Sequence, residues 1–160
     1  MPNRNPQTQR VFLVVVDQSP ELKVALRFAC RRARHSGGRV AMLYVTEPAE
    51  GVEWMGVGDL MREERRQEAE TKLAELAHHV HEMSGETPML YVREGEPREA
   101  LLALLEEEPA ISILVLAAGT GRAGPGPLIA ALSGKYSTRL RVPLTIVPGG
   151  LSDADIDAIT

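Results

Sequence analysis

The chain has 160 residues, of which 44% are hydrophobic and 25% charged, and its formal net charge is −4 at pH 7. These values are ordinary for one globular domain, and the negative charge argues against a general nucleic-acid-binding surface. No apolar run reaches the roughly 18 residues that a membrane span needs. The first ten residues lack the apolar centre of a signal peptide, and the single cysteine, Cys30, suits a reducing compartment. We therefore expect a cytoplasmic protein that binds neither membranes nor nucleic acid.

The first part of the chain reads as strand, helix, strand. Residues 11–16 form a continuous apolar run rich in valine, which predicts a strand buried on both faces. Ser19 is a good N-cap and Pro20 a good first helical residue, so we expect a helix from there to the glycines at 37–38. Residues 39–45 predict a second strand.

A long loop and a long helix follow. Residues 46–58 hold three glycines, a proline and Trp54, a composition that fits either a functional lid or a plain linker. Trp54 would then cover a bound base or pack the loop. We expect a helix over residues 59–84, with an apolar stripe made of Leu60, Leu73, Leu76, Ala77, Val80 and Met83.

The second half of the chain continues the alternation. Residues 89–92 predict a third strand, a helix begins at Pro97, and residues 111–118 predict a fourth strand. After a glycine-rich loop we expect a helical region at about 127–140 and a fifth strand at 143–147.

This order predicts an α/β domain with an open parallel sheet and helices on both faces. We assign residues 10–148 to the domain, residues 1–9 to a disordered lead and residues 149–160 to a tail with one weak helical turn and solvated acidic side chains. Ligands in such sheets bind at the carboxyl ends of strands, where the winding direction reverses. Two loops at such ends are unusual here, namely residues 17–20 and 119–127.

The second loop contains G-x-G-x-x-G, formed by Gly119, Gly121 and Gly124. A dinucleotide site would need a helix directly after this motif and an acidic residue about 20 positions on. Pro125 and Pro127 prevent such a helix, the acidic residue is missing, and the motif follows the fourth strand instead of the first. A dinucleotide site is therefore disfavoured.

A phosphate-binding P-loop is not matched either. Gly134 and Lys135 are followed by Tyr136 where that motif has Ser or Thr, and Ile129 stands in place of its first glycine. A different spacing does fit, because Gly121, Gly124 and Gly134 form G-x2-G-x9-G.

With this spacing, the chain resembles the universal stress protein family from about residue 11 to residue 148. The resembling pieces are the strand, Asp-containing turn and helix of "VFLVVVDQSPELKVALRF", the Gly-x-Pro helix start in "VREGEPREALL", the fourth strand "ISILVLAAG" and the closing "VPLTIVPG". The resemblance implies a five-stranded parallel sheet in the order 3-2-1-4-5, as in the adenine-nucleotide α-hydrolase-like fold.

The resemblance also implies a nucleotide site. In the nucleotide-binding branch, G-x2-G-x9-G wraps the ribose and phosphates of ATP, and an aspartate and a valine after the first two strands contact the nucleotide. Lys135 replaces a Ser or Thr of the branch, and the segment after Gly134 is about one turn short. The candidate nucleotide-binding residues are Asp17, Val45, Gly119, Gly121, Gly124, Gly134 and Lys135.

Other readings of these residues stay open. A second alignment pairs Ala118 and Gly121 with the first two glycines of the motif and leaves the third unmatched. The loop would cradle phosphate through backbone N–H groups, or it is a turn stiffened by prolines. Asp17 would contact the nucleotide or cap its own turn. A ligand or another backbone approaches Gly134, or a helix starts or stops there.

Two further groups suggest chemistry only weakly. His78 and His81 share a helix face, but Glu82 is the only acidic neighbour, which favours a solvated surface over a metal site. Cys30 falls on an apolar stripe, which favours a core residue over a nucleophile. We identify no metal site and no catalytic residue.

The sequence thus favours a non-enzymatic cytoplasmic protein that binds ATP, with or without magnesium, and signals to a protein partner by a conformational or oligomeric change. The alternatives are a structural dimer without nucleotide and a slow ATP hydrolase. We also expect a homodimer through the fifth strand, which is apolar, uncharged and at a sheet edge in the family's order. Otherwise the tail covers that edge and the protein is monomeric.

Overall fold

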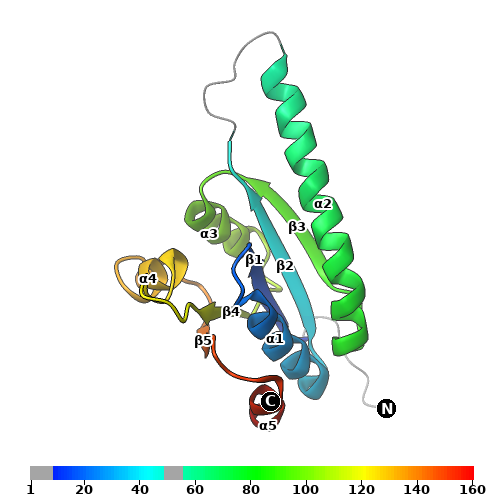
Figure 1. Cartoon of the computed structure of the whole chain (residues 1–160), viewed down its shortest axis with the longest axis vertical. Helices are drawn as coiled ribbons and strands as arrows, with labels where there is room; N and C mark the ends of the chain where they lie inside the picture. Colours follow the sequence, from blue (N-terminus) through cyan, green and yellow to red (C-terminus); the bar gives the residue numbers. More distant parts are fainter. Residues whose placement is uncertain (1–8, 49–55) are drawn as a thin grey trace.

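A computed structural model describes residues 9–48 and 56–160 (Figure 1). Its five strands form one parallel sheet in the order β3-β2-β1-β4-β5, which confirms the expected fold. In chain order the elements are β1 (Val11–Val16), α1 (Leu22–Ser36), β2 (Arg39–Thr46), α2 (Val57–Ser84), β3 (Met89–Glu94), α3 (Pro97–Glu107), β4 (Ile113–Ala118), α4 (Pro127–Ser133), the 3-10 helix η2 (Ser137–Arg139), β5 (Leu144–Pro148) and α5 (Asp153–Ile159). None of the described helices is both long and apolar enough to span a bilayer.

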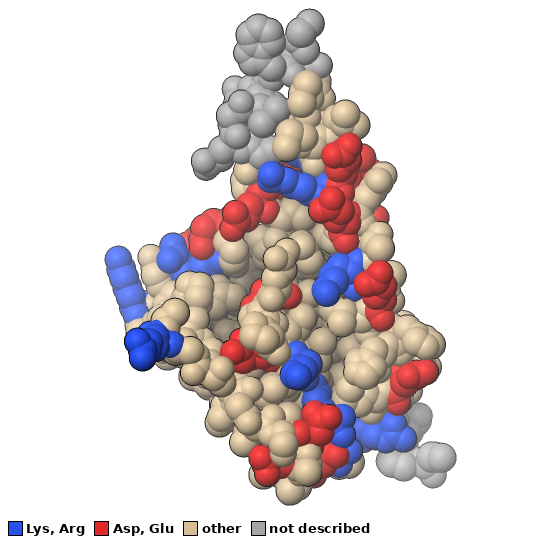
Figure 2. All heavy atoms as spheres, in the orientation of Figure 1, with Lys and Arg blue, Asp and Glu red and all other residues tan. Residues whose placement is uncertain are grey.

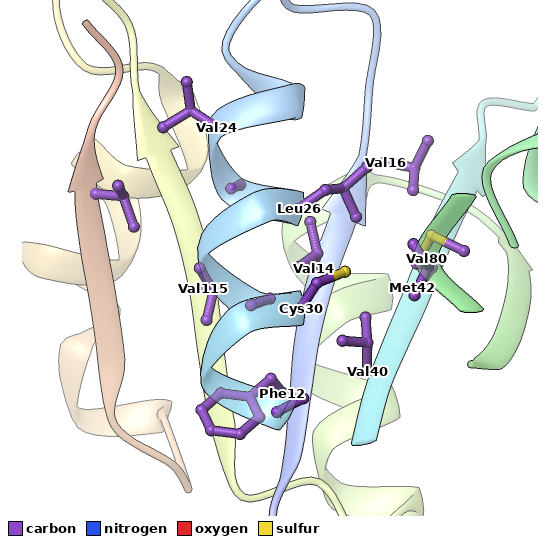
Figure 3. Close-up of a cluster of buried hydrophobic side chains, with 14 of the residues drawn as sticks. Phe12, Val14, Val16, Val24, Leu26, Cys30, Val40, Met42, Val80 and Val115 are labelled. Atoms are coloured by element: carbon purple, nitrogen blue, oxygen red, sulfur yellow. The ribbon is translucent and has the colours of Figure 1, made fainter. Parts of the chain in front are cut away.

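The central strand β1 is buried along its whole length because its side chains alternate between two cores. One core lies between the sheet and the helices α1, α2 and α5, and Figure 3 shows Phe12, Val14 and Val16 within it. The other core lies under α3 and α4 and takes the alternate side chains Val11, Leu13 and Val15. This burial explains why the run at 11–16 carries no polar residue.

The start of α1 differs from the prediction. Ser19 is not the N-cap, because Glu21 holds that position and the helix begins at Leu22. The backbone N–H of Ser19 donates to Oδ1 of Asp17 at 2.9 Å, so the chain turns once before the helix starts. Asp17 therefore caps its own turn, which is one of the two roles that the sequence allows for this residue.

The long helix α2 begins two residues earlier than expected, and its apolar stripe is shorter. Leu73 and Val80 are buried, but Leu60 is 60% exposed, which corrects its assignment to the stripe. Figure 1 shows the reason, because the first turns of α2 extend past the end of the sheet.

The predicted helical region at 127–140 is interrupted. The helix α4 ends at Ser133 with Gly134 at its C-cap, and only the short η2 follows. A Cβ at Gly134 would lie 2.9 Å from the carbonyl oxygen of Ala130. Of the readings left open for this glycine, the structure shows that a helix stops there.

The tail folds into a full helix, which corrects the expected weak turn. Ser152 and Asp155 form a capping box at the start of α5, and Ile156 is fully buried in the core beside α1. Asp157 is not a solvated acid, because both of its carboxylate oxygens accept hydrogen bonds from Arg27 at 2.8 Å. The tail thus packs on α1, and Ile146 of the edge strand β5 stays 43% exposed.

Candidate functional site

A cleft of about 510 Å³ opens at the carboxyl ends of β1, β2 and β4. The turn after β1, the end of β2, the beginning of α4 and the middle of α2 form its walls. This is the place where the order of the sheet reverses, since β1 pairs with β2 on one side and with β4 on the other. The volume lies within the range of small-molecule sites.

Apolar side chains line the inner part of the cleft. The ends of β1 and β4 contribute Val16 and Ala117, α1 contributes Leu22, and α4 contributes Leu128 and Ile129. Such a surface buries a flat apolar group, for example a heteroaromatic base, and leaves the polar parts of a ligand at the rim.

Two predicted site residues come together in this cleft. Asp17 lies in the turn after β1, and Val45 lies near the end of β2, where it pairs with Arg93 of β3. Asp17 is exposed, and its carboxylate accepts the hydrogen bond from Ser19 described above. Val45 packs on the core beneath α3 and α4. The sheet topology alone brings these two residues to one place.

The glycine loop closes on itself. The N–H of Gly119 donates to the carbonyl of Pro125 at 3.0 Å, and that of Gly124 donates to the carbonyl of Gly121 at 3.3 Å. A Cβ at Gly119 would lie 2.7 Å from the carbonyl oxygen of Gly124. The backbone of Gly124 itself has a φ angle of 87°. Within the described residues, Gly119, Gly121 and Gly124 do not line the cleft; the loop reaches it only through Pro125, Gly126 and Pro127.

The two remaining predicted residues also lie outside the lining of the cleft as far as the structure describes it. Gly134 closes α4, and Lys135 is exposed, with its Nζ 5.7 Å from the centre of the Tyr136 ring. Arg98 packs on the same ring at 4.0 Å. A role of Gly134 and Lys135 in ligand binding therefore stays a prediction.

Sequence reasoning missed several residues of the cleft. Glu21, at the start of α1, accepts hydrogen bonds at 3.3 Å from both the N–H and the hydroxyl of Thr120. Arg65 of α2 donates to the carbonyl of Glu47 at 2.6 Å. Nothing local marks Glu21, since Thr120 is 99 positions away, and the sequence signal for α2 concerns only its apolar stripe.

The rim of the cleft is acidic. Its described lining holds one cation, Arg65, against the four carboxylates of Asp17, Glu21, Glu47 and Glu68. Figure 2 shows Asp and Glu side chains along α2 and also near the middle of the same face. The electrostatic field at the rim therefore disfavours a ligand with many negative charges.

The other groups considered from the sequence lie elsewhere. Cys30 is fully buried, and burial raises the pKa of its thiol to about 12, so the thiol is neutral and no nucleophile at ordinary pH. His78 and His81 are exposed on α2, and the Nε2 of His78 lies 3.2 Å from Glu82. Trp54 and its proposed contact with a base lie outside the described residues.

Comparison with known proteins agrees with this architecture. The model of the universal stress protein family matches residues 9–148. No curated protein matches the sequence.

Solved structures are similar over nearly the whole chain. The universal stress protein UspA from Lactobacillus plantarum is 17% identical and has a TM-score of 0.72, with 86% of this chain and 97% of that chain covered. A universal stress protein in complex with cAMP is 20% identical with a TM-score of 0.55, over 89% of this chain and 98% of that chain. One from Archaeoglobus fulgidus in complex with dAMP is 15% identical with a TM-score of 0.51, over 87% and 97%.

At these identities the solved structures show the common fold, and the family model covers 140 consecutive residues, from 9 to 148. The sheet order and the family match agree. The chain belongs to the universal stress protein family.

Proposed function

We propose that the cleft binds an adenine nucleotide and that the protein is a nucleotide-responsive binding protein, not an enzyme. The observation that carries this proposal is the cleft itself, which opens at the reversal point of the sheet and brings Asp17 and Val45 together. Two structures of similar fold are complexes with cAMP and dAMP, which supports an adenine ligand for this protein.

The chemistry of the cleft fits the parts of such a ligand. The apolar inner surface beside Val16 and Leu128 suits the base, and the carboxylate of Asp17 suits the ribose hydroxyls as a hydrogen-bond acceptor. The carboxylate of Asp17 is exposed and its hydrogen bond from Ser19 uses one oxygen, Oδ1. ATP as the particular nucleotide, magnesium and a cytoplasmic location remain predictions.

Titration calorimetry with adenosine monophosphate tests this function. We expect saturable binding in the micromolar range, which corresponds to about −8 kcal/mol. Asp17→Ala should weaken binding by about tenfold, since it removes an acceptor for the ribose. Asp17→Asn keeps an acceptor and the turn with Ser19, and should bind within about threefold of wild type.

Exposed Glu75 on α2 lies outside this cleft, so Glu75→Gln serves as the matched control. Absence of heat with folded protein at millimolar adenosine monophosphate and at millimolar ATP would contradict the proposal. That result would favour the alternative of a structural dimer without nucleotide. Phosphate release from ATP at a rate that Asp17→Ala abolishes would instead favour the slow hydrolase.

A further inference from the structure

A carboxylate of the chain itself contacts the glycine loop, where the sequence predicts phosphate binding. Glu21 lies at the N-cap of α1, and one of its oxygens accepts hydrogen bonds from the N–H and the hydroxyl of Thr120. Thr120 belongs to the glycine loop after β4. An anionic oxygen on a backbone N–H of such a loop has the place that a phosphate oxygen takes in a phosphate-binding loop.

Four other positions of the loop offer no replacement for that N–H group. Gly119 and Gly124 donate within the loop, and Pro125 and Pro127 have no N–H to donate. Gly126 has φ of 115° and carries the loop into α4. Part of the loop is therefore folded for contacts within itself.

The charged residues of the cleft also disfavour a ligand with several phosphate groups. Glu21 stands with Asp17, Glu47 and Glu68 against the single cation Arg65 in the described lining. Arg65 donates through Nη1 to the carbonyl of Glu47, so it is held at the end of β2, on the side of the cleft opposite the glycine loop. A chain of phosphates in this cleft would meet like charges at its rim.

We infer that, contrary to the ATP predicted from the sequence, the cleft selects an adenine ligand with no more than one phosphate group, and that Glu21 is the residue that disfavours ATP. This inference rests on the proposed function, because it names the class of ligand for the same cleft. Adenosine and adenosine monophosphate keep the contacts of the base and ribose. ATP adds charge next to Glu21, whose carboxylate already accepts from the N–H of Thr120.

Calorimetric titrations with adenosine, adenosine monophosphate and ATP test the inference, with ATP measured both in EDTA and in excess Mg²⁺. For the wild-type protein we expect adenosine monophosphate to bind at least about tenfold more tightly than ATP under both conditions, through like-charge repulsion. Glu21→Gln keeps an oxygen acceptor for Thr120 and removes one charge. It should strengthen ATP binding by about fivefold and leave adenosine unchanged.

The control variant Glu75→Gln removes a carboxylate on α2 outside this cleft and should leave the binding of adenosine, adenosine monophosphate and ATP unchanged. ATP binding as tight as that of adenosine monophosphate, with or without Mg²⁺, would overturn the inference and leave the proposed function standing. An equal response of ATP to Glu21→Gln and Glu75→Gln would overturn the role of Glu21. No binding of any of the three ligands would overturn the proposed function, and the inference with it.

Discussion

Gly149, directly after β5, is a residue where three segments of the chain meet. A Cβ there would overlap the carbonyl oxygen of Ala118 at the end of β4 and would lie 2.6 Å from Cγ of Glu21. Glycine is therefore required for β4, α1 and the start of the tail to approach one another. This approach also positions the Glu21 side chain toward Thr120.

Replacement of Gly149 by alanine should destabilise the fold by about 1–3 kcal/mol, the usual cost of overpacking a closed site. Gly150 is a matched control, because a Cβ there would meet only a methyl carbon of Thr120 at an ordinary 3.8 Å. Gly150→Ala should stay within about 0.5 kcal/mol of wild type. Urea unfolding measures both, and equal stability of the two variants would contradict the close approach at Gly149.

At the scale of elements, the sequence predicts the strands well and the ends of the helices less well. The run at 11–16 is unambiguous because both faces of β1 are buried. The predicted start of α1 at Ser19 is wrong because the Asp17–Ser19 hydrogen bond competes with a cap at Ser19. The predicted burial of Leu60 is wrong because an apolar residue on a helix carries no information on whether a sheet lies beneath it.

The sequence could predict where the tail helix α5 begins, but not where it packs. Its capping box, Ser152 and Asp155, is a local sequence signal and could have been recognised. Its docking could not, because Arg27 and Asp157 lie 130 positions apart. Part of the candidate site could be predicted in the same way. The order of the strands places Asp17 and Val45 at one end of the sheet, but the contact of Glu21 with Thr120 is visible only in the folded structure.

The docking of α5 should depend on pH. The hydrogen bonds from Arg27, assisted by the charge of Arg31, hold the pKa of Asp157 below its ordinary value of 3.8. A group whose pKa is depressed by folding contributes stability above its unfolded pKa and loses it as the pH falls through its folded pKa. Asp157→Asn should therefore lower the Tm at pH 7, and the difference from wild type should vanish well below pH 3.8.

Thermal unfolding of both proteins across this pH range makes the comparison, with the exposed Glu75→Gln variant as a control for loss of one charge. A Tm difference that persists unchanged in acid would show that the carboxylate of Asp157 is not the group responsible.

At the scale of the whole molecule, the two edges of the sheet differ in what they offer a second copy. The edge strand β5 exposes Ile146 and carries no charged residue, whereas the opposite edge, β3, exposes Leu90 and ends in two charged residues, Arg93 and Glu94. Since α5 packs on α1, an uncharged edge remains at β5. We propose a two-fold dimer through β5.

Light scattering on a sizing column tests this proposal, with about 35 kDa expected for two chains by doubling the 17.4 kDa of one. Ile146→Lys should give monomers, because the two-fold axis brings like charges together at the edge. Leu90→Lys places the same charge on β3 and should leave the dimer intact. A monomeric wild type, or a dimer that responds only to Leu90→Lys, would refute an interface at β5.

The central claim is that an adenine nucleotide binds at the carboxyl ends of β1, β2 and β4. The most direct test is a titration of ¹⁵N-labelled protein with adenosine monophosphate, followed by amide chemical shifts. We predict saturable shifts concentrated at Asp17, Thr46 and Leu128, which line the cleft from the turn after β1, from β2 and from α4, with the exposed face of α2 around Glu75 unchanged. Shifts centred elsewhere on the molecule, or none at millimolar nucleotide, would contradict the claim.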